Sequence, residues 1–390
     1  MTRNGTLGAR GTPGKLTAAL ASLAVSALPL GAQQAWRSSL YPYAYYSTID
    51  GLWGAGHYGV SRPIGFVERP ELNAAAVTFD ASASTRGSYT LVADAQAPAH
   101  WAGWRAALTL TAARENRLGF YGLGNATRYV ADSVSPAQAY FYRVSRAHAS
   151  IRATIQRQLV GPLRAVAGAT IERTDFHALP GTSVFRQAVA TGVVDSTSIP
   201  FTDKTIRAGL VLDTRDNELD PHTGIFLEGL FASGPGYTRT TAGARVYVHP
   251  LERLVIAARL GGEGMGGRPP LAAQLVMESS ERPYIAVGGY RSLRGYYDAR
   301  FVGPGKLLAG LEARFAPLWA PSVLEMMLVG FYDAGRVFAP GEGFRLTTQD
   351  LHRSGGGEIA IRFMRNSLLV VGVGAGDEGA QLLFGTQWSY

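Results

Sequence analysis

The feature that most constrains the fold of this chain is a two-residue alternation of apolar and polar side chains. In segment 307–315 (LLAGLEARF), Leu and Ala recur at every second position, and Glu312 and Arg314 lie between them. Segment 357–363 (GEIAIRF) alternates a glutamate and an arginine with isoleucines in the same way. A period of two is that of a β-strand. Because a dry sandwich core could not hold so many unpaired charges, the pattern predicts strands around a polar interior.

The number of such segments predicts a barrel that spans a membrane. Sixteen segments show the pattern: 41–47, 51–62, 71–84, 87–97, 102–115, 138–159, 162–177, 204–215, 222–233, 238–249, 251–263, 305–316, 322–334, 353–363, 366–376 and 380–390. An even number of strands is usual in bacterial single-chain barrels. Short connections alternate with long ones at 116–137, 178–203, 264–304 and 335–352, as expected for periplasmic turns and outer loops. We therefore expect an all-β fold, a transmembrane antiparallel β-barrel of sixteen strands.

The N-terminal residues are typical of a secretory signal. Residues 1–32 begin with three positive charges, continue with an apolar run and end at a plausible cleavage point after Ala32. We expect residues 33–40 to form a short periplasmic tail and residues 41–390 to form the outer-membrane barrel. The chain has no cysteine, so the sequence excludes disulfide bonds and thiolate metal ligands.

The C-terminal segment, QLLFGTQWSY, predicts a last strand with an aromatic face. Its alternation places Leu382, Phe384, Trp388 and Tyr390 on one face, toward lipid, and polar residues on the other. Many outer-membrane barrels end in an aromatic residue, so we expect these four side chains to form a C-terminal assembly signal. Five tryptophans fall near predicted strand ends, where aromatic girdles meet the membrane interfaces: Trp53, Trp101, Trp104, Trp319 and Trp388.

One long connection, 264–304, carries a motif that could fold into the barrel. The motif is Leu293-Arg294-Gly295-Tyr296, and the next two predicted strands carry Glu312 and then Phe331, Asp333 and Gly335. Both carboxylates would face the lumen, where Arg294 could bind them and Phe331 could stack on its guanidinium. From the residues alone, an exposed Arg294 at the top of a loop is an equal alternative.

These motifs resemble the bacterial surface antigen family, the superfamily of outer-membrane assembly factors and two-partner secretion transporters. Segment 213–229, DTRDNELDPHTGIFLEG, is similar to a strand-turn-strand pattern of the same family. The resemblance implies that the loop folds into the lumen and that Arg294 docks on Glu312 and Asp333. The acidic residues of the 213–229 segment could bind Ca²⁺, but Pro221 and Gly224 favour a tight turn.

The resemblance implies a role in inserting or transporting protein or lipid at the bacterial outer membrane. Family members carry periplasmic POTRA domains, and the stretch from Gln33 to Leu40 has no room for one, so we expect a separate periplasmic partner protein. The first predicted strand, interrupted by Pro42, would pair weakly with the last and form a seam that opens toward lipid. The alternative is a passive or structural channel barrel plugged by its loop.

An enzyme is the third alternative. The sequence contains neither the G-x-S-x-G motif of hydrolases nor the H-E-x-x-H motif of metalloproteases, so we expect no catalytic site, no metal and no cofactor. Basic residues are scattered singly, whereas a nucleic-acid interface would gather them into a patch with aromatic residues. We expect a monomeric barrel in contact with outer-membrane lipids and not with nucleic acid.

Overall fold

A computed structural model describes residues 36–390 except 48, 65–70, 72, 321–323 and 364–366. The predicted signal peptide, residues 1–32, lies outside the described residues, as do residues 33–35 of the predicted tail. Small parts of the predicted strands, at residues 322–323 and 366, lie outside them as well. Within the described part of the chain, no helix is long and apolar enough to cross a membrane.

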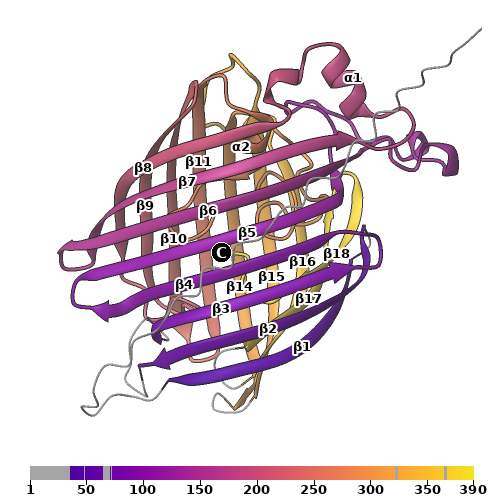
Figure 1. Cartoon of the computed structure of the whole chain (residues 1–390). Helices are drawn as coiled ribbons and strands as arrows, with labels where there is room; N and C mark the ends of the chain where they lie inside the picture. Colours follow the sequence, from indigo (N-terminus) through magenta and orange to yellow (C-terminus); the bar gives the residue numbers. More distant parts are fainter. Residues whose placement is uncertain (1–35, 48, 65–70, 72, 321–323, 364–366) are drawn as a thin grey trace, which may run out of the picture. The chain divides into compact units, whose positions relative to one another are not determined.

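Sixteen antiparallel strands form one sheet, in which each strand pairs with its neighbours in sequence. The strands are β1 (Arg37–Ser47), β2 (Gly51–Pro63), β3 (Asn73–Ser84), β4 (Tyr89–Trp101), β5 (Trp104–Gly119), β6 (Arg143–Val160), β7 (Leu163–Ala178), β8 (Phe201–Asp213), β9 (Gly224–Gly234), β10 (Tyr237–Leu251), β11 (Leu254–Gly267), β14 (Gly305–Ala320), β15 (Leu324–Phe338), β16 (His352–Phe363), β17 (Ser367–Gly376) and β18 (Gly379–Gly385). Figure 1 shows the tilted strands wrapped around a central space. The predicted sixteen-stranded β-barrel is confirmed.

The alternation has the predicted orientation, with apolar side chains outside and charges inside. On β14, Leu311 is 51% exposed and Phe315 is 45% exposed, whereas Glu312 and Arg314 are buried in the lumen. On β16, Ile359 is exposed and Glu358 is buried. The exposed apolar faces are those that meet hydrocarbon in a membrane barrel. The buried charges pair with one another and with groups of an inserted loop.

The long connections share one end of the barrel, as predicted. They span residues 120–142, 179–200, 268–304 and 339–351, and the other end has the C-terminus and connections of ten residues or fewer. Since outer-membrane barrels have short periplasmic turns, we call these the outer end and the periplasmic end. The helical elements all lie in long connections: η1 (Ala131–Ser133), η2 (Pro136–Gln138), α1 (Val184–Ala190), η3 (Ser196–Ser198) and α2 (Leu271–Leu275).

The connection 268–304, which we call the inserted loop, folds back into the barrel. It contains α2 and a two-stranded ribbon of β12 (Val276–Met277) and β13 (Tyr284–Ile285). Its buried side chains, among them Leu293 and Phe301, pack on Leu308 of β14 and Val337 of β15 in one apolar cluster. The lumen core is therefore made by the loop and the strands that follow it.

The first strand begins earlier than predicted. Residues 37–40, assigned to the periplasmic tail, belong to β1, which pairs with β2 from Arg37 opposite Ser61 to Ser47 opposite Gly51. Pro42 lies opposite Gly56 without interrupting the register. Because β1 is at one end of the strand order, the missing N–H of proline is tolerated there, as it is on an edge strand.

The last strand ends earlier than predicted, and this corrects the predicted aromatic face. Leu382, 76% exposed, and Phe384 face outward, but β18 ends at Gly385 and both Trp388 and Tyr390 are buried. These two side chains find hydrogen-bond partners in the lumen: Trp388 Nε1 donates to Asp220 Oδ1 (2.7 Å), and the Tyr390 hydroxyl donates to the Ala257 carbonyl (3.2 Å). Their predicted lipid-facing position is therefore wrong.

The girdle prediction has a mixed outcome for the same reason. Trp101 and Trp104 are exposed at the periplasmic ends of β4 and β5, as a girdle requires. Trp53 is buried, with its ring stacked on Tyr45 at 5.6 Å, and Trp388 lies in the lumen. The side chain of Trp319 lies outside the described residues.

Candidate functional site

The structure brings the predicted loop arginine to both predicted carboxylates. Arg294 Nε donates to Asp333 Oδ2 (2.7 Å), Nη2 donates to Asp333 Oδ1 (3.0 Å) and Nη1 donates to Glu312 Oε1 (2.7 Å). The guanidinium carbon lies 3.7 Å from the centre of the Phe331 ring. The arginine side chain is fully buried, and its two-point contact with Asp333 has the geometry of the stronger charge-assisted hydrogen bonds.

Strand register explains how two strands supply this site. In the ladder of β14 with β15, Glu312 lies opposite Phe331 and Gly310 lies opposite Asp333. Positions two residues apart on a strand share a face, so the side chains of Glu312, Phe331 and Asp333 all point into the lumen. Gly335, two residues further along β15, lies opposite Leu308 at the edge of the apolar cluster.

The other residues of the loop motif hold the loop in place. Leu293 is buried in the apolar cluster, and the Tyr296 hydroxyl donates to the Arg353 carbonyl of β16 (3.3 Å). Gly295 has a φ of +93°, and a Cβ there would lie 2.8 Å from the backbone of Ala375. Only glycine fits this position, because the backbone is left-handed and a strand passes next to it.

Sequence reasoning missed three members of this cluster. Glu358 of β16 lies 3.5 Å from Arg294 Nη1, Arg259 of β11 lies 3.5 Å from Asp333, and Arg314 of β14 lies 2.7 Å from Glu312. Three arginines thus face three carboxylates, and the signal that could have found Glu358 and Arg314 was their position on the polar faces of their strands.

The charge balance keeps the loop arginine ionised. Burial by itself lowers the pKa of Arg294, but the negative charge of Glu312 and the hydrogen bonds to Asp333 outweigh it, so the pKa lies above its ordinary value. A buried cation with well-formed partners of opposite charge avoids most of the cost of an unpaired charge. We call Arg294, Glu312, Asp333, Arg259, Arg314 and Glu358 the docking cluster.

A second ionic cluster holds the inserted loop at Glu278, between α2 and the loop tip. Lys306 of β14 is fully buried, and its Nζ donates to Glu263 Oε1 of β11 (2.6 Å). Glu263 Oε2 accepts the backbone N–H of Glu278 (2.8 Å), and Glu278 pairs with Arg152 of β6 (2.6 Å). The loop therefore crosses the lumen and binds the opposite wall of the barrel.

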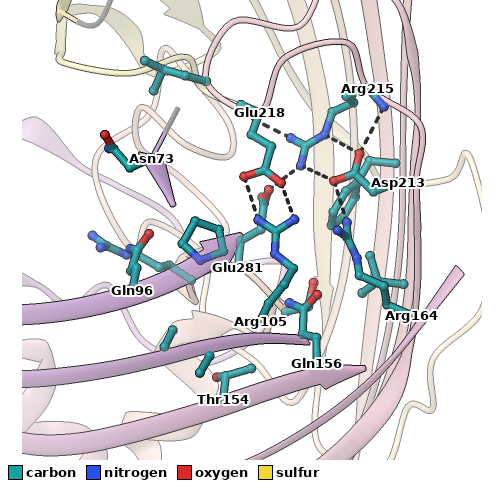
Figure 2. Close-up of a pocket in the computed structure, with 18 of the residues that line it drawn as sticks. Asn73, Gln96, Arg105, Thr154, Gln156, Arg164, Asp213, Arg215, Glu218 and Glu281 are labelled. Carbon is teal, nitrogen blue, oxygen red and sulfur yellow. Dashed lines mark hydrogen bonds and ion pairs between the residues drawn. The ribbon is translucent and has the colours of Figure 1, made fainter. Parts of the chain in front are cut away.

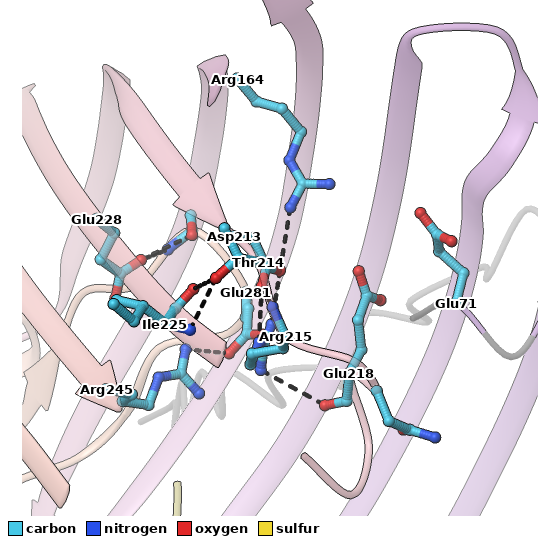
Figure 3. A network of polar contacts seen from close by, with 12 residues as sticks. Glu71, Arg164, Asp213, Thr214, Arg215, Glu218, Ile225, Glu228, Arg245 and Glu281 are labelled. Carbon is cyan, nitrogen blue, oxygen red and sulfur yellow. Dashed lines mark hydrogen bonds and ion pairs between the residues drawn. The ribbon is translucent and has the colours of Figure 1, made fainter. Parts of the chain in front are cut away.

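The tip of the inserted loop meets the strand-turn-strand motif at the periplasmic end. Glu281 pairs with Arg215 (2.7 Å) and with Arg245 (2.6 Å), and the Ser280 backbone N–H donates to Glu228 (2.7 Å). Figure 3 shows Arg215 between Asp213 and Glu281, so the turn and the loop tip form one network. Sequence reasoning did not predict this contact, because its partners are far apart in the chain.

Two polar side chains of the 214–223 connection, Asp216 and Asn217, bond the backbone of that connection. Asp216 Oδ1 accepts the backbone N–H groups of His222 (3.0 Å) and Thr223 (3.1 Å). Asn217 Oδ1 accepts those of Leu219 (2.8 Å) and Asp220 (3.0 Å). These side chains bond the backbone of their own connection, as the turn interpretation predicts. Within the described ranges, no group of three or more histidines and carboxylates is arranged to hold a metal ion.

The C-terminal residues bind the same docking cluster from the periplasmic end. The Ser389 hydroxyl donates to Glu312 Oε1 (2.6 Å), so the C-terminus and Arg294 share one carboxylate oxygen. The Trp388 ring lies 3.9 Å from the guanidinium carbon of Arg314. We call residues 386–390 the C-terminal tail. The Tyr290 hydroxyl of the inserted loop donates to the Gln387 carbonyl (2.8 Å), so loop and tail also contact each other directly.

Comparisons with known proteins agree with this architecture. Residues 78–376 match the family model of the Omp85 superfamily domain. No curated protein matches the sequence closely enough to count as a relative. The chain is similar to BamA from Haemophilus ducreyi lacking POTRA domains 1–3, with 13% identity and a TM-score of 0.54 over 89% of this chain and 69% of that one. It is also similar to CdiB from Escherichia coli, with 10% identity and a TM-score of 0.57 over 92% of this chain and 62% of that one.

The two structural likenesses concern the fold, since both identities are low. The family match covers most of the chain, including the strand-turn-strand motif, the inserted loop and the strands that carry the docking cluster. The resemblance carried by the sequence motifs is thereby confirmed, and the chain belongs to the Omp85 superfamily as an integral β-barrel of the bacterial outer membrane.

Proposed function

We propose that this barrel inserts or transports proteins at the outer membrane, through a seam between β1 and β18 and together with a separate periplasmic partner protein. Family membership and the barrel fold shared with BamA and CdiB support this class of function. The observation that carries the proposal is the form of the last strand, which is short and continues into an inward-turned tail.

The two strands at the seam do not match in length. β18 has seven residues, whereas β1 has eleven, so at least four residues of β1 cannot find a backbone partner in β18. β18 is also shorter than the roughly 9–11 residues that a tilted strand needs to cross a bilayer. Unpaired backbone groups are costly beside lipid, and an entering strand could satisfy them by adding to the free edge.

The tail connects this seam to the docking cluster. Side chains of β1 and β18 meet where the rings of Tyr45 and Phe384 stack with centroids 6.1 Å apart. Immediately after β18 the chain turns inward, and Ser389 binds Glu312 beside Arg294. A movement of the inserted loop would therefore change the contacts of the strand that forms the seam.

A crosslink across the seam tests the proposal. Cysteines at Tyr45 and Phe384 can be oxidised without competition, since the chain has no native cysteine. The matched control carries cysteines at Ile359 and Val371, which lie opposite each other in the ladder of β16 with β17. We expect oxidation of the seam pair to abolish function in the native bacterium, read as loss of outer-membrane and secreted proteins by quantitative mass spectrometry, and reduction to restore it.

The same experiment addresses the second candidate function, a passive channel plugged by its loop. The several ionic contacts that hold the inserted loop favour this alternative. If the oxidised seam pair functions as well as the oxidised control, the seam proposal is wrong. A passive channel would then keep its single-channel conductance in planar bilayers whether or not the seam is crosslinked.

We further propose that the chain is not an enzyme. The lumen carboxylates that could act as acids or bases, such as Glu312 and Asp333, are bonded to arginines. The purified, refolded barrel should hydrolyse neither phospholipids nor peptides. Hydrolysis that persists through two different purification tags would contradict this.

A further inference from the structure

A cavity lies inside the periplasmic half of the barrel, beside the tip of the inserted loop. Its volume is about 350 Å³, within the usual range for binding sites of small ligands. Residues 280–282 of the loop tip, the inner faces of β3 to β9 and the 214–223 connection contribute to its wall. Gln387 of the C-terminal tail also lines it, so the cavity contacts the two segments that reach the docking cluster.

The carboxylates of this wall already have cationic partners. Glu218 pairs with Arg105 (2.6 Å), Asp213 pairs with Arg164 (3.0 Å) and with Arg215, and Glu281 pairs with Arg215. Figure 2 shows these paired charges, and the uncharged side chains of Gln96, Thr154 and Gln156 also line the cavity. The wall carboxylates are therefore neutralised and do not prevent an anionic group from entering.

One arginine of the wall has no such partner. Arg291 of the inserted loop makes no ion pair with any described residue, and its Nε is buried without a hydrogen-bond acceptor among them. Its guanidinium carbon lies 5.1 Å from the centre of the Tyr284 ring, which holds the side chain in place. Burial lowers the pKa of this guanidinium, in contrast to Arg294 with its carboxylates. A partly buried cation without a partner of opposite charge is stabilised when an anion binds it.

The same wall also offers an acceptor that lacks a donor. Gln156 Oε1 is buried and accepts no hydrogen bond from the described residues, and Arg164 Nε is buried without an acceptor. A ligand that satisfies all three groups must therefore present both hydrogen-bond acceptors and an N–H or O–H donor. A phosphodiester group by itself presents acceptors only, so a lipid would need a headgroup hydroxyl or amine to supply the donor. A polypeptide presents backbone N–H and C=O groups, and its acidic side chains supply the anion.

We propose that this cavity binds an acidic residue of an extended polypeptide, with the carboxylate on Arg291 and the backbone on Gln156. The inference rests on the proposed function, from which it takes the polypeptide nature of the ligand, and it adds a preference for Asp or Glu. The position suits a segment of a transported protein that enters from the periplasmic end, because the loop tip and the C-terminal tail both line the cavity there.

Peptide binding to the full-length chain in detergent micelles tests the inference. One probe is a fluorescein-labelled peptide with blocked ends and a central Glu, and the other has Gln at that position. We expect the Glu peptide to bind about tenfold more tightly, a difference of about 1.4 kcal/mol, because its carboxylate can form a charge-assisted hydrogen bond with Arg291 and the amide of Gln cannot. Fluorescence anisotropy gives both dissociation constants.

Variants locate the preference. R291Q should bind both peptides with the affinity of the Gln peptide, and R291K should keep part of the preference. R268Q is the matched control, because it removes the same charge from an exposed position on the same loop, away from the cavity. Folding of each variant is checked by its heat-dependent mobility on gels. If R291Q does not fold, the comparison of the two peptides on the unaltered chain still decides.

Two outcomes would overturn the inference. One is equal affinity of the unaltered chain for the Glu and Gln peptides. The other is binding of a short-chain phosphatidylglycerol that depends on Arg291 while neither peptide binds, which would make the cavity a lipid site. The binding assay needs no transport and the seam crosslink does not involve Arg291, so failure of either proposal is recognised independently of the other.

Discussion

Arg294 is the residue on which the inserted loop depends most directly. Its guanidinium contacts Asp333, Glu312 and the Phe331 ring, and it is fully buried. Replacing it by alanine would leave buried carboxylates without their main cation. We expect Arg294→Ala to destabilise the refolded barrel by about 3–5 kcal/mol, the range measured when one partner of a buried pair is removed. Urea unfolding, followed by tryptophan fluorescence, measures this.

The loop itself should respond in the same variant. Proteolysis between residues 264 and 304 should become fast in Arg294→Ala and remain slow in Arg268→Ala, which removes an exposed arginine of the same loop. Arg294→Lys should be intermediate, because lysine keeps the charge and loses the two-point contact with Asp333. Unchanged heat resistance together with unchanged proteolysis in Arg294→Ala would show that the docking cluster does not hold the loop.

Glu281 at the loop tip gives a dependence on pH. Partial desolvation would raise its pKa, but the positive charges of Arg245 and Arg215 outweigh this effect, so the pKa lies below the ordinary value of 4.5. A carboxylate whose pKa is lowered by docking stabilises the docked state at pH values above its ordinary pKa. This stabilisation is lost as the pH falls from the ordinary pKa toward the lowered one. The tip should therefore loosen in acid.

A fluorophore attached at a cysteine in place of Arg282, whose side chain is 52% exposed at the loop tip, measures this loosening by its accessibility to iodide. Quenching should increase as the pH falls below about 4.5, and Glu281→Gln should show the high quenching already at neutral pH. Glu342→Gln is the control, since that glutamate lies in a different outer connection, where it pairs with Arg336 and Arg345. A pH response that persists in Glu281→Gln would assign the titration to another group.

At the scale of elements, the alternation of apolar and polar side chains predicted the sixteen strands, because it depends on which face of each strand meets water. This information is local, as in LLAGLEARF, where Gly310, Glu312 and Arg314 alternate with Leu311, Ala313 and Phe315. Ends of elements depend on distant partners and were predicted less well. The segment QLLFGTQWSY continues to alternate beyond Gly385, yet its last residues bind Asp220, Ala257 and Glu312, which no local pattern indicates.

The candidate site likewise contains residues that the sequence predicted and residues that only the structure revealed. The motif residues from Leu293 to Gly335 were identified through the family resemblance, which supplied their spacing across three elements. Arg259 and Arg291 carry no motif, and their importance comes from the charges and cavities around them. The contact of Glu281 with Arg215 likewise required the path of the inserted loop, which the sequence did not determine.

The C-terminal tail has a predicted energetic role that differs from that of an assembly signal. Trp388 is 4% exposed and packs on Arg314, so Trp388→Ala should destabilise the refolded barrel by about 3–5 kcal/mol. Phe384→Ala is the matched control, because that ring is exposed on the lipid face of β18, and its effect on the refolded barrel should be smaller. Unfolding both variants after they have refolded in vitro measures stability alone, because no cellular assembly machinery that could read the C-terminal residues is present. If the two substitutions lowered the free energy of unfolding equally, Trp388 would not hold the C-terminal tail in the lumen.

At the scale of the whole molecule, the inserted loop and the seam make separable contributions. Gly264 of β11 lies opposite Gly305 of β14, so a short Gly-Ser linker can replace residues 270–303 without separating the strands. Without the loop, a sixteen-stranded barrel should enclose a water-filled channel, as porins of this size do. We expect planar-bilayer recordings of the deleted barrel to show a steady conductance well above that of the full chain. Replacement of residues 340–350, in a different outer connection, should change the conductance little.

The deletion also distinguishes a route through the lumen from a route through the seam. If proteins leave through the seam, the loop-deleted barrel with oxidised cysteines at Tyr45 and Phe384 should conduct ions and still fail to insert or transport proteins. If they pass through an unplugged lumen, the same oxidised barrel should remain active. Conductance and protein transport measured on one doubly altered chain therefore decide between the two routes, because the crosslink closes only the seam and the deletion opens only the lumen.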